Sequence, residues 1–253
     1  MIFTMVGKRK MILGIQLYSI RDVLAQDWEK GLEELAQMGY KSVETAGFSY
    51  SDVEGVGAKL KSLGLEVPSV HSQLPLGDKS SKVIDEACQV GASCVISGRG
   101  PDDFKTADGI KRVAEMFNEA RENASRAGLS VGYHNHEWEY LDIEGTPAYR
   151  VLAENLHPDV KMEIDTYWVA VGGKKPAEVI EELGDRVAYV HFKDGPGERG
   201  PANVAVGQGF MDFDTIFEKL ENPVAGYVEF DTCDTDIMEA SEKSLRFLEG
   251  KVK

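Results

Sequence analysis

Short apolar runs alternate with amphipathic segments along almost the whole chain of 253 residues. The apolar runs are rich in Val and Ile and have the length of buried strands, whereas the longer segments repeat their apolar residues at helical spacing. Eight strand-then-helix units of about thirty residues each match a (β/α)8 barrel in both number and length. We therefore expect a single α/β domain, a TIM barrel, over residues 11–253.

The expected strands are residues 11–19, 42–46, 67–73, 93–97, a run from 129 into the stretch Tyr133–Tyr140, 160–166, 187–193 and 226–231. The expected helices are residues 27–38, 53–63, 79–89, 105–127, 147–155, 176–183, 214–221 and 237–249. Asp27 is a suitable N-cap for the first of these helices. A doubly wound sheet is the alternative, but it normally carries a glycine-rich phosphate turn after its first strand, and residues 16–19 contain no glycine.

The chain is acidic, with 43 Asp and Glu against 28 Lys and Arg and a net charge of −15. Long-range repulsion makes nucleic acid an unexpected partner for such a chain. No apolar stretch approaches the roughly 20 residues of a membrane helix, so no membrane is expected as a partner either. The three cysteines lack a Cys-x-x-Cys spacing, which predicts neither a disulfide framework nor a thiolate zinc site.

Residues 1–10 include Lys8, Arg9 and Lys10, but the apolar run that follows is short and ends without a small-residue cleavage site. We expect these residues to form a frayed or disordered leader of a cytoplasmic protein. The sequence leaves the oligomeric state open, a homo-oligomer included.

The stretch Tyr133–Tyr140 reads Tyr-His-Asn-His-Glu-Trp-Glu-Tyr and follows an apolar lead directly. Most of these groups can bind a metal, move a proton or hold a hydroxyl, and the stretch lacks the aliphatic residues that bury a strand. A solvated strand end with two surface histidines is the plain alternative. Polar residues also end three later apolar runs, at Asp165, His191 and Glu229.

In a barrel the carboxyl ends of the strands meet at one mouth, so these polar strand ends are expected to be neighbours. Asp165, His191 and Glu229 offer oxygen, nitrogen and oxygen donors from consecutive strands, and the Tyr133–Tyr140 stretch offers a fourth donor. Such a set suits a divalent cation, Mn²⁺, Co²⁺, Zn²⁺ or Mg²⁺. Taken singly, the three residues have plainer explanations as a helix cap, a hydrogen-bonded core histidine and a rim charge.

These residues resemble the sugar phosphate isomerase/epimerase family of xylose isomerase-like barrels, which is related to inosose dehydratases and ketose 3-epimerases. The resemblance covers nearly the whole chain. Its most specific parts are the Tyr-His-Asn-His and Asp-Thr-Tyr-Trp segments. The segments that carry it are residues 13–19, 133–136 with 139, 163–168, 191–194, 207–209 with 212, and Glu229.

The resemblance implies one divalent metal at the mouth of the barrel, held by a Glu, an Asp, a His and a second Glu. Asp165, His191 and Glu229 fall on three of these positions, and we assign Glu139 to the fourth. Many relatives carry a Glu close before an Asn in strand five, where this chain has His134. His134 is therefore the substitute ligand or an acid/base group.

The chemistry that follows is proton movement next to a carbonyl, since a metal that bridges a hydroxyl and its adjacent carbonyl stabilises an enediolate. His134, His136 and Glu229 are the candidate acid/base groups. Lys193 could supply a positive charge to the enediolate, although a rim lysine is more often solvated. We expect His71 and Glu44, at the ends of earlier strands, to bind the substrate. Tyr133 and Trp168 are expected to offer aromatic faces to it.

The expected function is a metal-dependent isomerase or epimerase acting on a ketose or related polyol. A dehydratase or lyase acting on an inosose or 3-keto glycoside is the alternative, because it shares the same apparatus. A barrel that binds sugar without catalysis is a further one. An abasic-site endonuclease is disfavoured by five histidines and a charge of −15. An unphosphorylated sugar is at least as well supported as a phosphorylated one, since only Arg99 and Arg199 stand on suitable loops.

Overall fold

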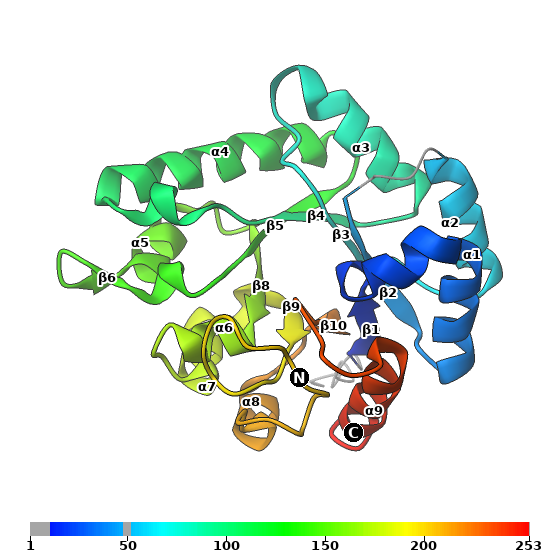
Figure 1. Ribbon diagram of the computed structural model, residues 1–253. Helices are drawn as coiled ribbons and strands as arrows, with labels where there is room; N and C mark the ends of the chain where they lie inside the picture. The colour runs from blue at the N-terminus through cyan, green and yellow to red at the C-terminus, as the bar shows by residue number, and fades with distance from the viewer. Residues whose placement is uncertain (1–10, 48–51, 253) are drawn as a thin grey trace, which may run out of the picture.

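A computed structural model describes residues 11–47 and 52–252. Eight parallel strands close into a barrel in the order β1-β10-β9-β8-β5-β4-β3-β2, which confirms the predicted fold (Figure 1). The barrel strands are β1 (Ile12–Gln16), β2 (Ser42–Ala46), β3 (Ser69–His71), β4 (Cys94–Ser97), β5 (Ser130–His134), β8 (Lys161–Asp165), β9 (Val187–Phe192) and β10 (Ala225–Val228). A two-stranded antiparallel hairpin, β6 (Asp142–Ile143) and β7 (Thr146–Pro147), lies outside the barrel.

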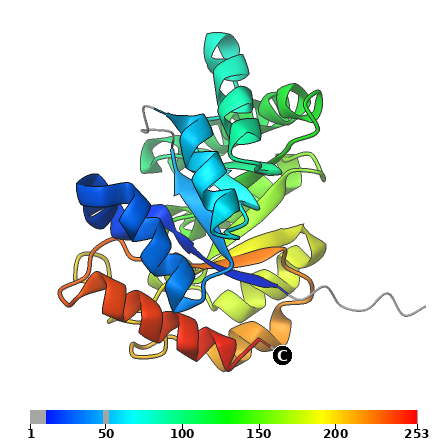
Figure 2. The ribbon, with the colours of Figure 1, turned by 90° about the vertical axis from the view of Figure 1, so that its right-hand side faces the viewer.

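Helices surround the barrel on its outer face, as the two ribbon views show (Figures 1 and 2). The α-helices are α1 (Arg21–Met38), α2 (Val53–Ser62), α3 (Ser80–Gln89), α4 (Ala107–Ser125), α5 (Ala148–Asn155), α6 (Thr166–Val171), α7 (Pro176–Leu183), α8 (Phe213–Lys219) and α9 (Ile237–Glu249). Short 3-10 turns are η1 (Leu17–Ile20), η2 (Gly77–Lys79), η3 (Pro101–Phe104), η4 (Trp138–Tyr140) and η5 (Gly184–Arg186). Among the described residues, none of the helices combines the length and the apolarity that crossing a bilayer requires.

The apolar residues form two separate cores. The larger one fills the layer between the strands and the helices, where residues such as Val43, Phe117 and Phe192 are fully buried. The smaller one lies inside the barrel and consists of Cys94, Ile96, Ala188, Tyr189, Ala225 and Tyr227. A side chain at Gly14 would overlap Ser42 and the ring of Tyr227, so glycine at this strand position leaves room for the tyrosine.

Strand alternation decides which side chains enter the barrel. In β8, Glu163 and Asp165 share one face, and both are fully buried. In β5 the neighbours Tyr133 and His134 face opposite ways, and the ring of Tyr133 packs against Phe117 of α4 with ring centroids 4.9 Å apart. The inner face therefore becomes polar toward the carboxyl ends of the strands, where the predicted site lies.

The elements differ from the predicted ones mainly at their ends. The first helix begins at Arg21, six residues earlier than predicted, and it kinks at Asp27, whose φ of −157° and ψ of 94° are not helical. Asp27 still acts as a cap, because its Oδ1 accepts a hydrogen bond from the backbone N–H of Lys30 at 3.1 Å. Helix α6 was not predicted, and the predicted leader, residues 1–10, lies outside the described residues.

Candidate active site

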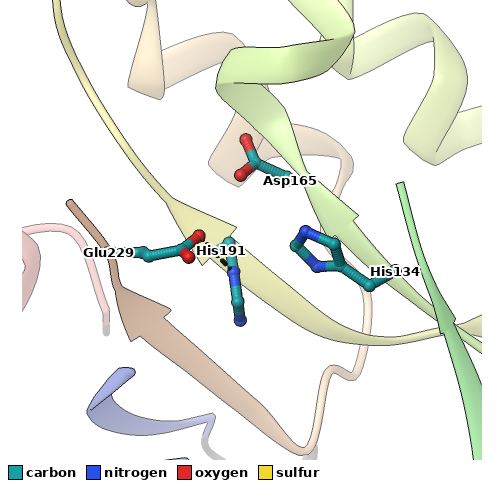
Figure 3. A group of neighbouring side chains, drawn as sticks. All are labelled: His134, Asp165, His191 and Glu229. Atoms are coloured by element: carbon teal, nitrogen blue, oxygen red, sulfur yellow. Dashed lines mark hydrogen bonds and ion pairs between the residues drawn. The ribbon is translucent and has the colours of Figure 1, made fainter. Parts of the chain in front are cut away.

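Four side chains from consecutive strand ends meet at the mouth of the barrel. His134 ends β5, Asp165 ends β8, His191 lies near the end of β9, and Glu229 follows β10. One potential ligand atom of each residue lies within 4.8 Å of the others, and all four residues are buried. Figure 3 shows the four side chains pointing toward one another. We call these residues the mouth cluster.

Asp165 is held by its position at the start of α6. Its Oδ1 accepts a hydrogen bond from the backbone N–H of Trp168 at 2.9 Å, which caps the helix. Its Oδ2 is buried and accepts no hydrogen bond among the described residues, although it forms an ion pair with Nζ of Lys193 at 3.1 Å. The amide of Asn135 fixes the same strand end, because it accepts from the backbone N–H of Asp165 at 3.0 Å and donates to the Asp165 carbonyl at 3.2 Å.

His191 contacts carboxylates through both ring nitrogens. Nδ1 lies 2.6 Å from Oε2 of Glu229, inside the mouth cluster. Nε2 lies 2.8 Å from Oε2 of Glu44 and 3.2 Å from Oε1 of Glu163. His134 contacts Glu163 as well, since its Nδ1 lies 2.9 Å from Oε2. Each imidazole of the cluster is therefore oriented by a carboxylate of the barrel interior.

Lys193 is buried at the cluster rather than solvated. Its Nζ forms an ion pair with Oδ2 of Asp165 at 3.1 Å, and it lies 3.2 Å from Oε2 of Glu229 and 2.6 Å from Oδ2 of Asp231. It also lies 5.0 Å from the ring centroid of Trp168. Strand alternation explains the position, because Lys193 follows His191 by two residues and faces the same way.

Burial and neighbouring charges shift the pKa values of Asp165 and Glu229 in opposite directions. Burial raises the pKa of Asp165 to about 6, although the charge of Lys193 opposes this rise. Burial also acts to raise the pKa of Glu229, but the positive charges of Lys193 and His191 hold it well below its usual value. Burial acts to lower the pKa of Lys193, yet its carboxylate neighbours raise it overall, so the side chain stays charged.

The pKa values of Glu163 and Glu44, inside the barrel, are also shifted in opposite directions. Burial and then the charge of Glu44 raise the pKa of Glu163 well above the usual range. Burial acts against ionisation of Glu44 too, but the hydrogen bond and charge of His191 lower its pKa overall. The pKa of His191 is raised by Glu163 and Glu229 against the effect of burial, while burial and the neighbouring His191 hold the pKa of His134 well below 6.5.

The mouth cluster fits a divalent cation. It offers two imidazole nitrogens and two carboxylates, a donor set that suits Zn²⁺, Co²⁺ or Mn²⁺. Oδ2 of Asp165 is buried and accepts no hydrogen bond among the described residues, although the ammonium of Lys193 lies 3.1 Å away, so it is an acceptor that a bound cation would satisfy. Nδ1 of His134 faces Glu163, so Nε2 is the ring nitrogen that this residue can offer to a metal in the cluster.

Glu139, the predicted fourth ligand, lies outside the mouth cluster. Its Oε1 accepts a hydrogen bond from the hydroxyl of Tyr133 at 2.5 Å, and its Oε2 accepts one from the backbone N–H of His136 at 2.9 Å. Burial raises the pKa of Glu139 to about 8. The structure thus brings His134, rather than Glu139, beside Asp165, His191 and Glu229.

Two further predicted residues lie apart from the mouth. Tyr133 faces α4 and is fully buried, so its ring offers no face to a sugar. Glu44 is fully buried beneath the cluster, where Gln16 and Ser69 also donate hydrogen bonds to it, each at 2.6 Å. Both positions follow from strand alternation and depth in the barrel rather than from the residue types.

His71 and His136 both lie next to His134, with ring centroids 4.9 Å and 5.1 Å from its ring. His71 is partly exposed, and its Nδ1 lies 4.0 Å from Oε2 of Glu163. The ring of His136 stacks on Trp138 with centroids 4.3 Å apart, and its Nδ1 is buried without a hydrogen-bond partner among the described residues. Burial lowers the pKa of His136 to about 3.

A pocket of about 370 Å³ opens beside the cluster. Aromatic faces and polar groups from the loops after β5, β8, β9 and β10 line it: His136, Trp138, Tyr167, Trp168, Glu198, Arg199, Gly200, Pro201, Asn203, Asp231 and Thr232. Arg199 pairs with Glu137 at 2.6 and 2.8 Å and lies 4.9 Å from the ring of Trp168. The pair joins the loop after β9 to the loop after β5.

A model of the xylose isomerase-like TIM barrel family matches residues 32–251. The chain belongs to this family. An inosose dehydratase from Geobacillus kaustophilus is 26% identical over 239 residues, covering 75% of this chain and 74% of that protein. The structure of a sugar phosphate isomerase/epimerase from Parabacteroides distasonis aligns with a TM-score of 0.83 at 26% identity, covering 100% of this chain and 98% of that one.

The IOLI protein, whose crystal structure holds a zinc atom, has the same fold, with a TM-score of 0.74 at 14% identity, covering 96% of this chain and 98% of that one. The xylose isomerase-like family therefore includes proteins named for two kinds of reaction, isomerisation or epimerisation and dehydration.

Sequence reasoning missed two residues of this site, Glu163 and Asp231. Both stand two positions from a predicted ligand, Glu163 before Asp165 and Asp231 after Glu229. The period of two in a strand would have placed them on the inner face. The same rule would have separated Tyr133 from His134.

Proposed function

We propose that this protein is a divalent-metal-dependent enzyme that moves a proton at the carbon next to a carbonyl of a sugar or related polyol, as an isomerase or epimerase. The observation that carries this proposal is the convergence of His134, Asp165, His191 and Glu229 at one buried point at the mouth of the barrel. Plain structural roles for these residues do not require four donors from four consecutive strands to meet.

The metal would be held by the mouth cluster, with His134 as the strand-five ligand. When bound, a divalent cation supplies Lewis-acid stabilisation of the negative charge that develops on a carbonyl oxygen. Glu139 instead supports the loop after β5 through its bonds to Tyr133 and His136.

Lys193 provides the positive charge of the protein itself at this place. Its ammonium group stands beside two of the four cluster residues and keeps its charge. A fixed cation aimed at a developing oxyanion lowers the barrier without reorganisation, which makes electrostatic stabilisation by Lys193 the second part of the proposal.

His136 and His71 are the proposed proton carriers. Their ring centroids lie 4.9 and 5.1 Å from that of His134, and both residues are partly exposed whereas His134 is buried. Nδ1 of His136 has no hydrogen-bond partner among the described residues. Epimerisation needs two proton-transfer groups, because one removes a proton from one face of the carbon and the other returns one to the opposite face.

The pocket beside the cluster is proposed to hold the rest of the substrate, with its C–H surface on the ring of Trp168. The nearby cations are already paired, Lys193 with Asp231, Arg199 with Glu137 and Arg99 with Asp103. This pairing favours an unphosphorylated sugar, since a phosphate would have to displace a carboxylate from its partner.

A dehydratase is the second candidate, and the 26% identity to an inosose dehydratase favours it. Both reactions begin with removal of the same proton. They diverge when a β-hydroxyl leaves, which requires an acid beside the leaving oxygen. A protonated group that delivers its proton to this oxygen would then replace the group that returns the proton to carbon.

The test is to strip the protein of metal, reload it with Zn²⁺, Co²⁺, Mn²⁺ or Mg²⁺ in turn, and incubate each form with ketoses, inososes and 3-keto glycosides in D₂O. We expect deuterium to appear at a carbon next to a carbonyl only in the loaded forms. An epimerase returns labelled sugar of unchanged mass apart from deuterium, and a dehydratase releases water from its substrate.

Two results would contradict the proposal. One is an absence of deuterium exchange over the whole panel with every metal. The other is unchanged sugar binding in Asp165→Ala together with a purified protein that takes up no divalent cation, which would indicate a barrel that binds sugar without catalysis.

A further inference from the structure

Glu44 is a buried carboxylate one layer beneath the mouth cluster. It lies in the middle of β2, on the opposite side of the barrel from β8, and is fully buried. A carboxylate in such a place is costly unless its oxygens accept hydrogen bonds. Because the residue is shielded from solvent, it does not reach a substrate at the mouth.

Both oxygens of Glu44 are engaged. Oε1 accepts a hydrogen bond from the hydroxyl of Ser69 at 2.6 Å, and that hydroxyl lies 2.9 Å from the hydroxyl of Tyr227. Oε2 accepts one from Nε2 of Gln16 at 2.6 Å and lies 2.8 Å from Nε2 of His191. Two side chains, Gln16 of β1 and Ser69 of β3, thus hold the carboxylate against the ring of His191.

The two ring nitrogens of His191 serve different neighbours. Nδ1 faces the mouth cluster at 2.6 Å from Glu229, while Nε2 faces Glu44 at 2.8 Å, and Glu163 at the longer distance of 3.2 Å, on the far side of the ring. An imidazole that donates its Nε2–H to a carboxylate presents the lone pair of Nδ1 to a metal, and such a partner also raises the basicity of the ligand.

We propose that Glu44 is a positioning residue that holds His191 with Nε2 protonated and Nδ1 turned to a metal in the mouth cluster. This inference rests on the proposed metal site, and it gives Glu44 a role other than the substrate binding expected from the sequence. Gln16 and Ser69 act through Glu44, because they hold its carboxylate but do not contact His191.

The test compares Glu44→Gln and Glu44→Ala with the wild type and with Ser69→Ala, which removes one of the two donors to the Glu44 carboxylate. The glutamine substitution keeps the size of the side chain and its capacity for neutral hydrogen bonds, so this variant is expected to fold. We expect the affinity for Zn²⁺, measured by competition with a chromophoric chelator, to fall about 10-fold in Glu44→Gln and up to about 100-fold in Glu44→Ala. Ser69→Ala should lower the zinc affinity by less than Glu44→Gln does, because the charge of Glu44 remains and its Oε2 still contacts His191.

Two further measurements separate positioning from a merely structural role. In nitrogen-15 NMR of the zinc-loaded protein, the Nε2 proton of His191 should resonate far downfield and move upfield in Glu44→Gln. Thermal unfolding without metal shows how much of the change is lost stability.

The inference is overturned if Glu44→Gln lowers the unfolding temperature but leaves the zinc affinity and the His191 resonance unchanged. It is also overturned if Nε2 of His191 proves to be the metal-bound nitrogen. Failure of the proposed function looks different, because the wild type itself would then bind no zinc in the competition assay.

Discussion

Nζ of Lys193 lies 2.6 Å from Oδ2 of Asp231, and the same ammonium contacts the carboxylates of Asp165 and Glu229. Lysine is thereby placed next to two residues of the mouth cluster. One positive charge among three carboxylates stabilises the empty protein but repels a second cation. Lys193 should therefore act in opposite directions on metal affinity and on catalysis.

We expect Lys193→Met to bind Zn²⁺ at least as tightly as the wild type, since the competing charge is gone, and to turn over about 10²–10³-fold more slowly, since the oxyanion loses its partner. Without metal the variant should lose about 3–5 kcal/mol of stability, because buried carboxylates remain unpaired. Chelator competition, steady-state kinetics and urea unfolding measure the three effects.

Lys175→Met is the control, as the side chain of Lys175 is 79% exposed and pairs only with Glu178 among the described residues. It should change none of the three quantities. A Lys193→Met variant that bound zinc weakly and kept its turnover would assign the lysine to metal-site assembly instead.

A comparison of His134→Ala with Glu139→Gln tests which of the two residues is the metal ligand at the end of β5. Removing His134 takes a donor from the mouth cluster, so zinc affinity should fall by more than the roughly 100-fold seen for an outer partner. Glu139→Gln should retain the zinc affinity, because Glu139 contacts Tyr133 and the backbone of His136 rather than the cluster. The reverse ranking would restore Glu139 as the ligand.

His134→Glu extends the same comparison. It changes the cluster from two imidazoles to one, and carboxylates suit Mg²⁺ and Mn²⁺ better than imidazole does. We expect the metal content of protein loaded from an equimolar mixture to shift from zinc toward manganese. An unchanged ratio would mean that His134 does not contribute to the choice of metal.

The raised pKa of Glu139 leads us to expect that the stability of the protein depends on pH. Its pKa in the folded protein is about 8, compared with about 4.3 in an unfolded chain, so the folded protein keeps a proton that the unfolded chain releases. The resulting stability is fully present below about pH 4 and is lost as the pH rises toward 8. Glu139→Gln, a permanent neutral mimic, should remove this part of the slope.

In urea unfolding with a chelator present, Glu139→Gln should match the wild type near pH 4 and exceed it by more than about 1 kcal/mol near pH 8.5, since one pKa unit corresponds to about 1.4 kcal/mol. The difference in unfolding free energy between the two proteins is used because the contributions of the other buried carboxyl groups, which are present in both, cancel. A difference that stays flat with pH would show that Glu139 is ionised throughout.

The barrel itself could be predicted from sequence, because eight buried strands and eight amphipathic helices leave a strong period in the residue pattern. The neighbourhood of Asp165, His191 and Glu229 followed from it, since all parallel strands end at one mouth. The boundaries were less predictable. The polar run after Gly132, for example, ends as a strand at His134 and continues as a loop and a 3-10 turn.

The choice between His134 and Glu139 depended on geometry that the sequence does not carry. Whether Glu139 turns inward is set by the turn Trp138–Tyr140 and by the hydroxyl of Tyr133 on the outer side of the strand. The burial of Lys193 was equally hidden, because it depends on the carboxylate of Asp231 from the neighbouring strand end.

The loop after β9 offers a last prediction, which concerns Gly209. The carboxylate of Asp194 accepts four backbone hydrogen bonds, from Gly195, Gly207, Gly209 and Met211, at 2.9 to 3.2 Å. A Cβ atom at Gly209 would overlap this carboxylate, so Gly209→Ala should cost about 1–3 kcal/mol and expose the loop to limited proteolysis. Gly100→Ala, with nothing within 4 Å of the added atom, should change neither quantity. The same loop carries Arg199 into the pocket. We therefore expect KM to rise in Gly209→Ala while the zinc affinity stays unchanged. Weaker zinc binding would instead show that the loop supports the mouth cluster.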